Sequence, residues 1–156
     1  MQEPLVCIID DEEAIRESLR LLLFAEGLQS IAFESADAYL EQAPPHTFDC
    51  MLLDIRMPGT DGLELFRILN KRHSPFPVIF ITGHGDIPLA VSAIKHGAFD
   101  FLTKPFEEGE LLSKVKSAIR HYQADREHRE ELNQIQCRVE SCTPRERDVL
   151  KLLAQG

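Results

Sequence analysis

The feature of this chain that most restricts its fold is a series of five short apolar runs. They lie at residues 5–9, 28–33, 50–53, 78–81 and 99–102. Runs this short and this apolar are typical of strands that are buried on both faces of a sheet. Helical patterns separate them, and this alternation predicts parallel strands joined by right-handed crossovers. We therefore expect a five-stranded, parallel, doubly wound α/β domain over residues 1–121.

Several of the intervening helices can be placed from their apolar spacing. Two carry their apolar side chains at Ile15, Leu19, Leu22 and Leu23, and at Leu63, Phe66 and Leu69. A helix over about residues 88–96 is expected to end at Gly97, a residue type that favours helix termini. The last helix starts near Glu107 and turns one side to the core, at Leu111, Leu112, Val115, Ile119 and Tyr122.

The chain changes character after this domain. Residues 122–142 are polar and of mixed charge, and we expect a helical linker there. Two interpretations stay open: a solvated helix, or a weak two-stranded coiled coil whose seam Asp125 and Arg129 interrupt. Residues 143–156 begin with Thr143, Pro144 and Glu146, which form a capping box at a helix start. This short amphipathic segment cannot bury its apolar stripe alone, so we expect it to be the first helix of a truncated domain.

Charge and composition exclude several classes of protein. The net charge is −9, and residues 123–156 hold seven acidic against six basic side chains. Neither part therefore has the basic surface that binds nucleic acid through bulk charge. The four cysteines do not have the paired spacing of a zinc site. We find no signal peptide and no run long enough to span a bilayer, so a cytoplasmic protein is expected.

Polar residues follow four of the five predicted strands. Asp10 and Asp11 follow the first, Asp54 the third and Thr82 the fourth, and Lys104 lies close behind the fifth. The carboxyl ends of parallel strands share one edge of a doubly wound sheet, where ligands bind. Three carboxylates at that edge repel each other unless a cation compensates them, and oxygen ligands suit Mg²⁺. A metal, a lysine and a hydroxyl around a carboxylate are the parts of a phosphoryl-transfer site.

Four segments of the chain resemble the receiver domain of two-component response regulators of the FixJ/NarL family. They are VCIIDD at residues 6–11, LDIRMPGTDG at 53–62, ITGHGD at 81–86 and FLTKPF at 101–106. The resemblance implies the flavodoxin-like receiver fold. The tail, TPRERDVLKLLAQG at residues 143–156, resembles the opening of a LuxR-type helix-turn-helix domain, of which it covers only the first helix.

The resemblance also implies roles for single residues. Asp54 would accept a phosphoryl group from the phosphohistidine of a sensor histidine kinase. Asp11, Asp54 and the backbone carbonyl of Arg56 would ligate Mg²⁺ directly, and Asp10 through water. Thr82 and Lys104 would bind the phosphoryl oxygens.

Further implications concern switching and output. Phe101 would move together with Thr82 on activation, and the Lys104–Pro105 peptide would be cis. Phosphorylation would drive a homodimer through residues 87–102 and, in the full-length protein only, control DNA binding. The family is regulatory rather than enzymatic beyond its own phosphorylation and dephosphorylation. A stand-alone phosphorelay receiver without DNA-binding output is the alternative.

Two other classes fit the residues less well. A Mg²⁺-dependent phosphatase with an aspartyl nucleophile needs a second aspartate two residues after the first, and this position holds Arg56, which cannot relay a proton. A nucleotide- or flavin-binding domain needs a glycine-rich turn after its first strand. The acidic residues 10–13 stand there instead and repel phosphates.

Overall fold

The structure is a computed structural model that describes residues 3–43, 48–74 and 76–141, with side chains as far as residue 128. The chain divides into two units, residues 1–122 and 123–156. Within the described residues, none of the helices has the length and apolar character that crossing a membrane requires. The predicted helix start at 143–156 and the side chains beyond residue 128, which would help to distinguish a coiled coil from a solvated helix, lie outside the described part.

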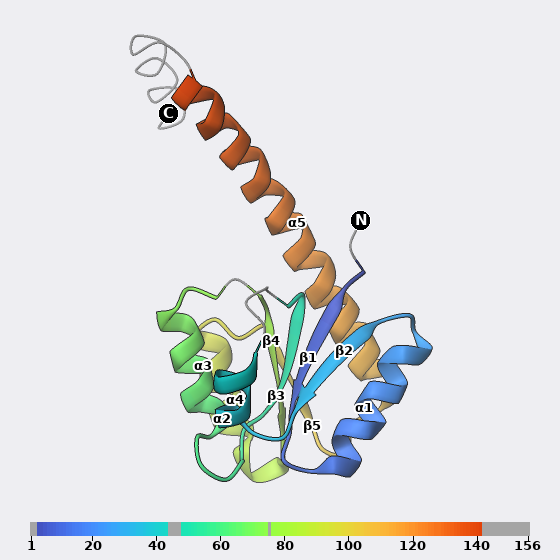
Figure 1. Cartoon of the computed structure of the whole chain (residues 1–156). Coiled ribbons are helices and arrows are strands. Elements are labelled where there is room, and N and C mark those ends of the chain that lie inside the picture. The colour runs from blue at the N-terminus through green and yellow to red at the C-terminus, as the bar shows by residue number, and fades with distance from the viewer. Residues whose placement is uncertain (1–2, 44–47, 75, 142–156) are drawn as a thin grey trace. The chain divides into compact units, whose positions relative to one another are not determined.

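The first unit contains a five-stranded sheet in which every neighbouring pair of strands is parallel. The strands lie in the order β2-β1-β3-β4-β5 (Figure 1). They are β1 (Leu5–Ile9), β2 (Gln29–Phe33), β3 (Cys50–Asp54), β4 (Val78–Thr82) and β5 (Asp100–Thr103). The prediction of a parallel doubly wound sheet with the flavodoxin-like receiver fold is confirmed, since this strand order is that of flavodoxin-like folds.

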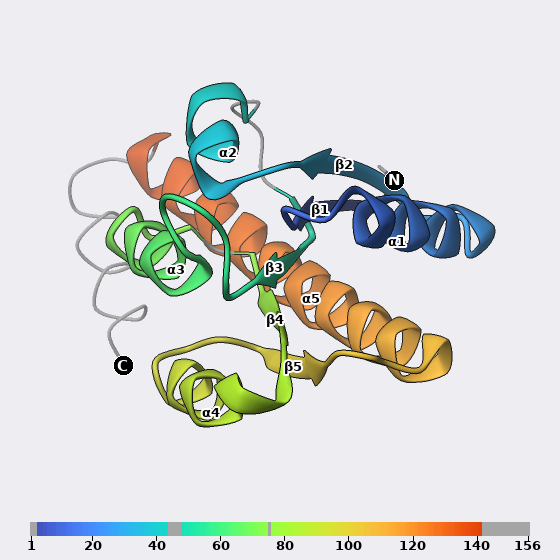
Figure 2. The ribbon, with the colours of Figure 1, turned by 90° about the horizontal axis from the view of Figure 1, so that it is seen from below.

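Helices cover both faces of this sheet. They are α1 (Glu13–Ala25), α2 (Ala36–Gln42), α3 (Gly62–Lys71), α4 (Ile87–Lys95) and α5 (Glu108–Ser141), with a 3-10 turn, η1 (His84–Asp86), before α4. Figure 2 shows α1 and the start of α5 on one face, and α2, α3 and α4 on the other. The polar residues predicted from the sequence lie at or directly after the carboxyl ends of the strands.

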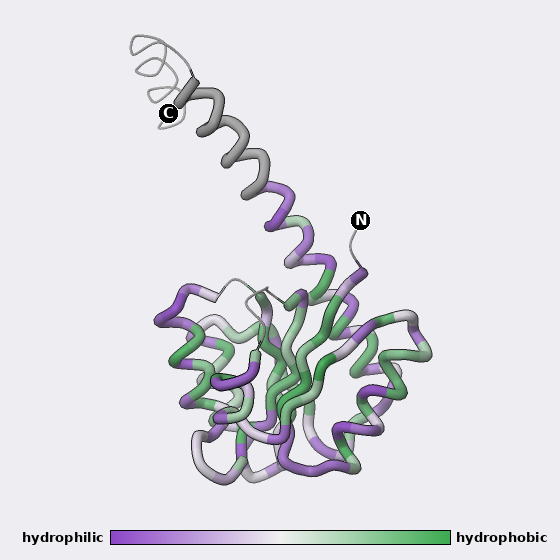
Figure 3. Tube along the Cα trace, viewed as in Figure 1, coloured by the Kyte–Doolittle hydropathy of each residue, from purple (hydrophilic) through white to green (hydrophobic). Residues whose placement is uncertain are grey.

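The buried side chains form two clusters, one on each face of the sheet. Successive residues of β1 alternate between them: Val6 and Ile8 pack with α1 and α5, while Cys7 and Ile9 pack toward α2 and α3. This alternation is the two-residue period of a strand, and it explains why the central strands β1, β3 and β4 are apolar up to their carboxyl ends, whereas the outer strands β2 and β5 also carry Gln29, Ser30 and Asp100. The strands form the apolar centre of the unit in Figure 3. Cys7 and Cys50 are buried free thiols and act as small apolar side chains.

Five of the ten strand boundaries differ from the prediction by one residue, among them the end of β5, which lies at Thr103 instead of residue 102. Asp54 and Thr82 are polar, so the apolar runs appeared to end before them, yet both residues belong to their strands and are buried. The second strand and the fifth begin one residue later than expected, at Gln29 and Asp100. The helix predicted at 88–96 is α4, which begins at Ile87 and ends just before Gly97, whose φ is 110°.

Candidate phosphorylation site

The predicted polar residues lie at the carboxyl end of the sheet, at the lower edge of the strands in Figure 1. The chain reverses its direction of winding between β1 and β3, which are neighbours in the sheet although β2 separates them in sequence. Ile9 of β1 pairs with Leu53 of β3, so Asp10 and Asp54 follow at the next position of each strand. Such a switch point leaves a crevice at the strand ends, where doubly wound proteins bind ligands.

Lys104 lies between the carboxylates of this edge. Its Nζ is 3.1 Å from Asp10 Oδ2, 3.6 Å from Asp54 Oδ2 and 3.7 Å from Glu12 Oε1. Lys104 directly follows the last residue of β5 and precedes a cis Lys104–Pro105 peptide bond, and its backbone N–H donates to Thr82 O at 2.8 Å. Burial lowers the pKa of Lys104, but Asp10, Asp54 and Glu12 outweigh this and raise it. The lysine is therefore a fixed positive charge among three carboxylates.

Asp10 is the most deeply buried of these acids, at 1% exposure. Its Oδ1 accepts the backbone N–H of Glu12 at 2.9 Å, which fixes the side chain at the start of α1. Its Oδ2 is buried without a well-formed hydrogen bond, although it is paired in charge with Lys104. A buried carboxylate oxygen of this kind needs a further partner, such as a water or a cation.

The carboxylates of Asp10, Asp11 and Glu12 offer oxygen atoms that lie within 4.8 Å of one another. Asp10 is buried, whereas Asp11 and Glu12 are exposed at the mouth of the crevice. An oxygen-only set of this size, next to an incompletely bonded buried oxygen, fits a hard divalent cation such as Mg²⁺ that keeps several waters. Lys104 connects this acidic cluster to Asp54, because its Nζ lies near both Asp10 Oδ2 and Asp54 Oδ2.

Thr82 and Phe101 occupy adjacent strands behind this cluster. Thr82 is buried at the end of β4, and its hydroxyl donates to the backbone carbonyl of Gly83 at 3.1 Å. Phe101 of β5 pairs with Phe80 of β4 and is half-buried. Lys114 of α5 donates to Phe101 O at 2.7 Å and lies 5.7 Å from the centre of its ring. The hydroxyl of Thr82 therefore lies at the carboxyl end of β4, where it donates its hydrogen bond to the next residue along the chain, Gly83.

Asp54 holds its proton far more tightly than an ordinary aspartate. Burial, which has the largest effect, and the charges of Asp10 and Asp11 together raise the pKa of Asp54 from 3.8 to about 7, although Lys104 opposes them. The ionised form of Asp54 is therefore costly in the absence of a cation at this edge. Burial is the main cause, and the crowding of carboxylates that the sequence predicted for these strand ends adds to it.

We expect Asp54→Asn to stabilise the metal-free protein at alkaline pH. Because the pKa is raised in the folded state, the folding penalty of ionised Asp54 is fully present above about pH 7 and disappears as the pH falls toward 3.8. The variant should gain on the order of 2 kcal/mol at pH 8 in EDTA, and much less at pH 4.5. Urea unfolding of both proteins at the two pH values measures this. An equal difference at both values would contradict the assigned cause.

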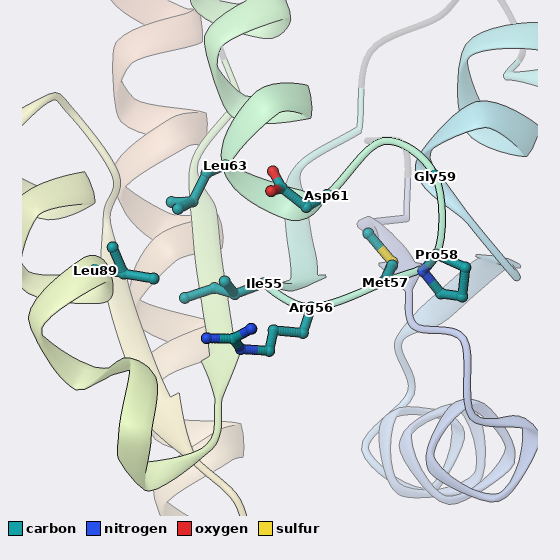
Figure 4. Close-up of a pocket in the computed structure, with 8 residues that line it drawn as sticks. All are labelled: Ile55, Arg56, Met57, Pro58, Gly59, Asp61, Leu63 and Leu89. Carbon is teal, nitrogen blue, oxygen red and sulfur yellow. The ribbon is translucent and has the colours of Figure 1, made fainter.

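The loop that follows β3 carries Arg56 and is held by contacts on both sides. Figure 4 shows the Arg56 side chain extending away from Pro58 and Gly59, along the wall of an open pocket that Leu63 and Leu89 also line. Its guanidinium forms two hydrogen bonds to Asp86, Nε to Oδ2 and Nη2 to Oδ1, each of 2.7 Å. The side chain therefore points to the segment before α4.

The other side of this loop contacts α2. Asp37 accepts the hydroxyl of Thr60 at 2.7 Å, and a Cβ at Gly59 would lie 2.6 Å from Asp37 Oδ2. Gly59 also has a φ of 78°, which a side chain disfavours. At the end of the loop, Asp61 caps α3 by accepting the N–H of Glu64 at 2.8 Å.

Three contributors to the site were not found from the sequence. Glu12 joins the charges around Lys104, Asp86 pairs with Arg56, and Asp37 bonds to Thr60. Glu12 had a signal, because it continues the acidic run after β1. Asp86 and Asp37 had none that a single sequence reveals, since they contact residues 30 and 23 positions away.

Comparison with known proteins agrees with this geometry. Residues 6–116 match the response regulator receiver domain. Transcriptional regulatory protein FixJ of Bradyrhizobium diazoefficiens is 44% identical over 151 residues, which are 97% of this chain and 74% of that protein. Response regulator protein TmoT of Ectopseudomonas mendocina is 41% identical over 155 residues, 99% of this chain and 70% of that protein.

A solved structure gives the same result in three dimensions. The response regulator StyR matches with a TM-score of 0.87 and 40% identity, over 99% of this chain and 78% of that one. The receiver match covers well over half of the chain, and the relatives named above exceed 40% identity across nearly all of it. The chain therefore belongs to the response regulators of two-component systems and is a FixJ-type regulator of transcription with a receiver domain at residues 6–116.

Proposed function

We propose that Asp54 accepts a phosphoryl group from the phosphohistidine of a sensor histidine kinase, and that this controls DNA binding by the full-length protein. The observation that carries the proposal is the position of Asp54, buried at the switch point with Lys104 Nζ 3.6 Å from its Oδ2. An Asp54 oxygen attacks the phosphorus, the phosphorus–nitrogen bond of the phosphohistidine breaks, and its electron pair stays on the imidazole. The product is an acyl phosphate on Asp54.

The surrounding residues have distinct parts in this reaction. Lys104 and the Thr82 hydroxyl bind oxygens of the phosphoryl group and balance its charge. Asp11, Asp54 and the Arg56 carbonyl would hold Mg²⁺ directly, and Asp10 through water. Bound there, Mg²⁺ supplies charge neutralisation for the phosphoryl oxygens and for the crowded carboxylates. The chain's own chemistry is limited to its phosphorylation and the hydrolysis of the acyl phosphate.

Mg²⁺ binding tests the metal part of the proposal. Asp11→Asn removes the charge of a direct ligand that is exposed and has no structural contact to lose. We expect its Mg²⁺ affinity to fall roughly tenfold or more, and phosphorylation by acetyl phosphate to require correspondingly more Mg²⁺. Calorimetric titration with Mg²⁺ measures the affinity. Glu41→Gln, an equal change of charge on exposed residue 41 of α2, is the control. Unchanged Mg²⁺ affinity in Asp11→Asn would remove Asp11 from the site.

The segment 87–102 is the proposed dimer surface. It begins with α4, in which Leu89 and Val91 are exposed at 40% and 41% while Ala90 is buried. The same segment includes β5, the neighbour of the strand that ends at Thr82, and it contains Phe101. A change in the conformation of Thr82 and Phe101 can therefore alter this surface. Phosphorylation then favours the dimer by shifting a population of conformations.

Sedimentation velocity tests this assembly. With Mg²⁺ and beryllofluoride, which mimics the phosphoryl group, we expect a dimer at micromolar concentration, and a monomer without them. Leu89→Asp should keep the monomer in both conditions because it places a charge in an apolar contact. An unchanged mass of the wild-type chain under both conditions would exclude dimerisation through this segment.

The remaining proposals concern the rest of the chain. We infer a receiver domain at 1–121, a helical linker at 122–142 and the beginning of a LuxR-type helix-turn-helix domain at 143–156. FixJ, which supports this, is a transcriptional regulatory protein by name, and both FixJ and the response regulator TmoT extend beyond this chain. A cytoplasmic location follows from the proposed partners, a sensor kinase and DNA.

A further inference from the structure

The contact between Arg56 and Asp86 joins the two loops that flank the phosphorylation site. Arg56 lies two residues after Asp54, and Asp86 lies four residues after Thr82. Both oxygens of Asp86 accept hydrogen bonds from the guanidinium, at 2.7 Å each. Paired, charge-assisted bonds of this length are the strongest that two side chains form without a metal, and they fix orientation as well as distance.

Asp86 is placed as the N-cap of α4 but does not act as one. Aspartate at this position normally accepts a backbone N–H of its own helix. Here the Asp86 side chain makes no cap hydrogen bond and turns to Arg56 on the neighbouring loop. The Asp86 side chain is 9% exposed, whereas that of Arg56 is 77% exposed. The hydrogen bond from Arg56 lowers the pKa of Asp86, so its carboxylate is ionised throughout the neutral range.

The segment that Asp86 holds has few other restraints. Gly83 and Gly85 flank His84, and a Cβ at either glycine would meet no atom within 4 Å. Among the described residues, no other side-chain hydrogen bond or ion pair joins residues 83–86 to a segment beyond β4. Two glycines in open space permit a change of backbone conformation, so the ion pair decides which conformation this segment adopts.

In the conformation that the ion pair holds, the Thr82 hydroxyl is bonded to the Gly83 carbonyl. Its proposed role requires it to leave that carbonyl and donate to a phosphoryl oxygen. We propose that Asp86 is a positioning residue: through Arg56 it holds residues 83–86 in the arrangement that keeps Thr82 from the phosphoryl group, and so opposes activation. This inference rests on the proposed function, and it adds to it the element that sets the balance between the two conformations.

The proposal predicts tighter binding of a phosphoryl mimic when the ion pair is removed. Asp86→Asn and Arg56→Gln each abolish the paired charges, and neither alters the Arg56 carbonyl. We expect each variant to bind beryllofluoride, in saturating Mg²⁺, about five- to tenfold more tightly than the wild type, a typical size for coupling between two sites. The double variant should gain no more than either single one, because all three lack the same contact. Without beryllofluoride, the Mg²⁺ affinity of Asp86→Asn should stay that of the wild type, because Asp86 supplies no metal ligand.

Arg67→Gln is the matched control, because Arg67 pairs with Glu64 at 3.1 Å within α3, away from both loops. It should leave beryllofluoride affinity unchanged. Equal affinity of the wild type, Asp86→Asn and Arg56→Gln would overturn the inference and assign the pair a purely structural role. Weaker binding by both variants would also overturn it, since the pair would then support the activated state. A wild-type chain that binds no beryllofluoride would instead refute the proposed function itself.

Discussion

Asp54→Asn should reduce phosphorylation of this chain by acetyl phosphate and Mg²⁺ to background. Asparagine has nearly the shape of aspartate, but its amide lacks the nucleophilic oxygen that forms the acyl phosphate. Intact-protein mass spectrometry should show one added phosphoryl group on the wild type, removable by hydroxylamine, and none on the variant. This is a complete loss rather than a reduction, because no other group in the site takes the same place at the end of β3.

Asp49→Asn is the control for this experiment. Asp49 is a second buried aspartate, just before the other end of β3, where it accepts the backbone N–H of Leu5 at 2.9 Å. Asparagine keeps a carbonyl oxygen for that bond, so the control should fold and accept one phosphoryl group like the wild type. Labelling of Asp54→Asn at the wild-type level would show that another residue is the acceptor.

Gly62→Ala should destabilise the folded chain by about 3 kcal/mol, at the upper end of the effects of overpacking. A Cβ at Gly62 would lie 2.2 Å from the Asp54 carbonyl oxygen and 3.0 Å from both Asp54 C and Ile55 Cα. All three are backbone atoms, so no side chain can move aside. The loop that closes here is fixed by the Gly62 N–H, which donates to Ile55 O at 2.9 Å. Relief of the contact must therefore displace the strand end that carries Asp54.

Urea unfolding measures this loss, and Gly109→Ala is its control. Gly109 is the second residue of α5, and a Cβ there would meet no atom within 4 Å. Alanine at that position should be neutral or stabilise the helix by about 0.5–1 kcal/mol. A Gly62→Ala variant as stable as the wild type would mean that the backbone near Asp54 relaxes without cost.

The sheet and its layers were determined by the sequence itself. Burial on both faces makes the central strands apolar at nearly every position, and the helices between them require apolar side chains at a different period, so both patterns are visible in one sequence. The order of strands and helices then leaves few topologies, because parallel crossovers are right-handed. Even the location of the site followed, since Asp10, Asp54 and Thr82 come at the ends of three parallel strands that share an edge.

Only the tertiary structure determined which groups lie close to each of these side chains, and how those neighbours change its pKa. The pKa of about 7 at Asp54 depends on burial and on the distances to Asp10, Asp11 and Lys104, none of which a spacing specifies. The pairing of Arg56 with Asp86 and the closeness of Gly62 to the Asp54 backbone join segments whose contact depends on loop conformation. Periodicity reports which face of an element is buried. It carries no information on which side chains from separate loops meet, because those contacts are set by packing in three dimensions.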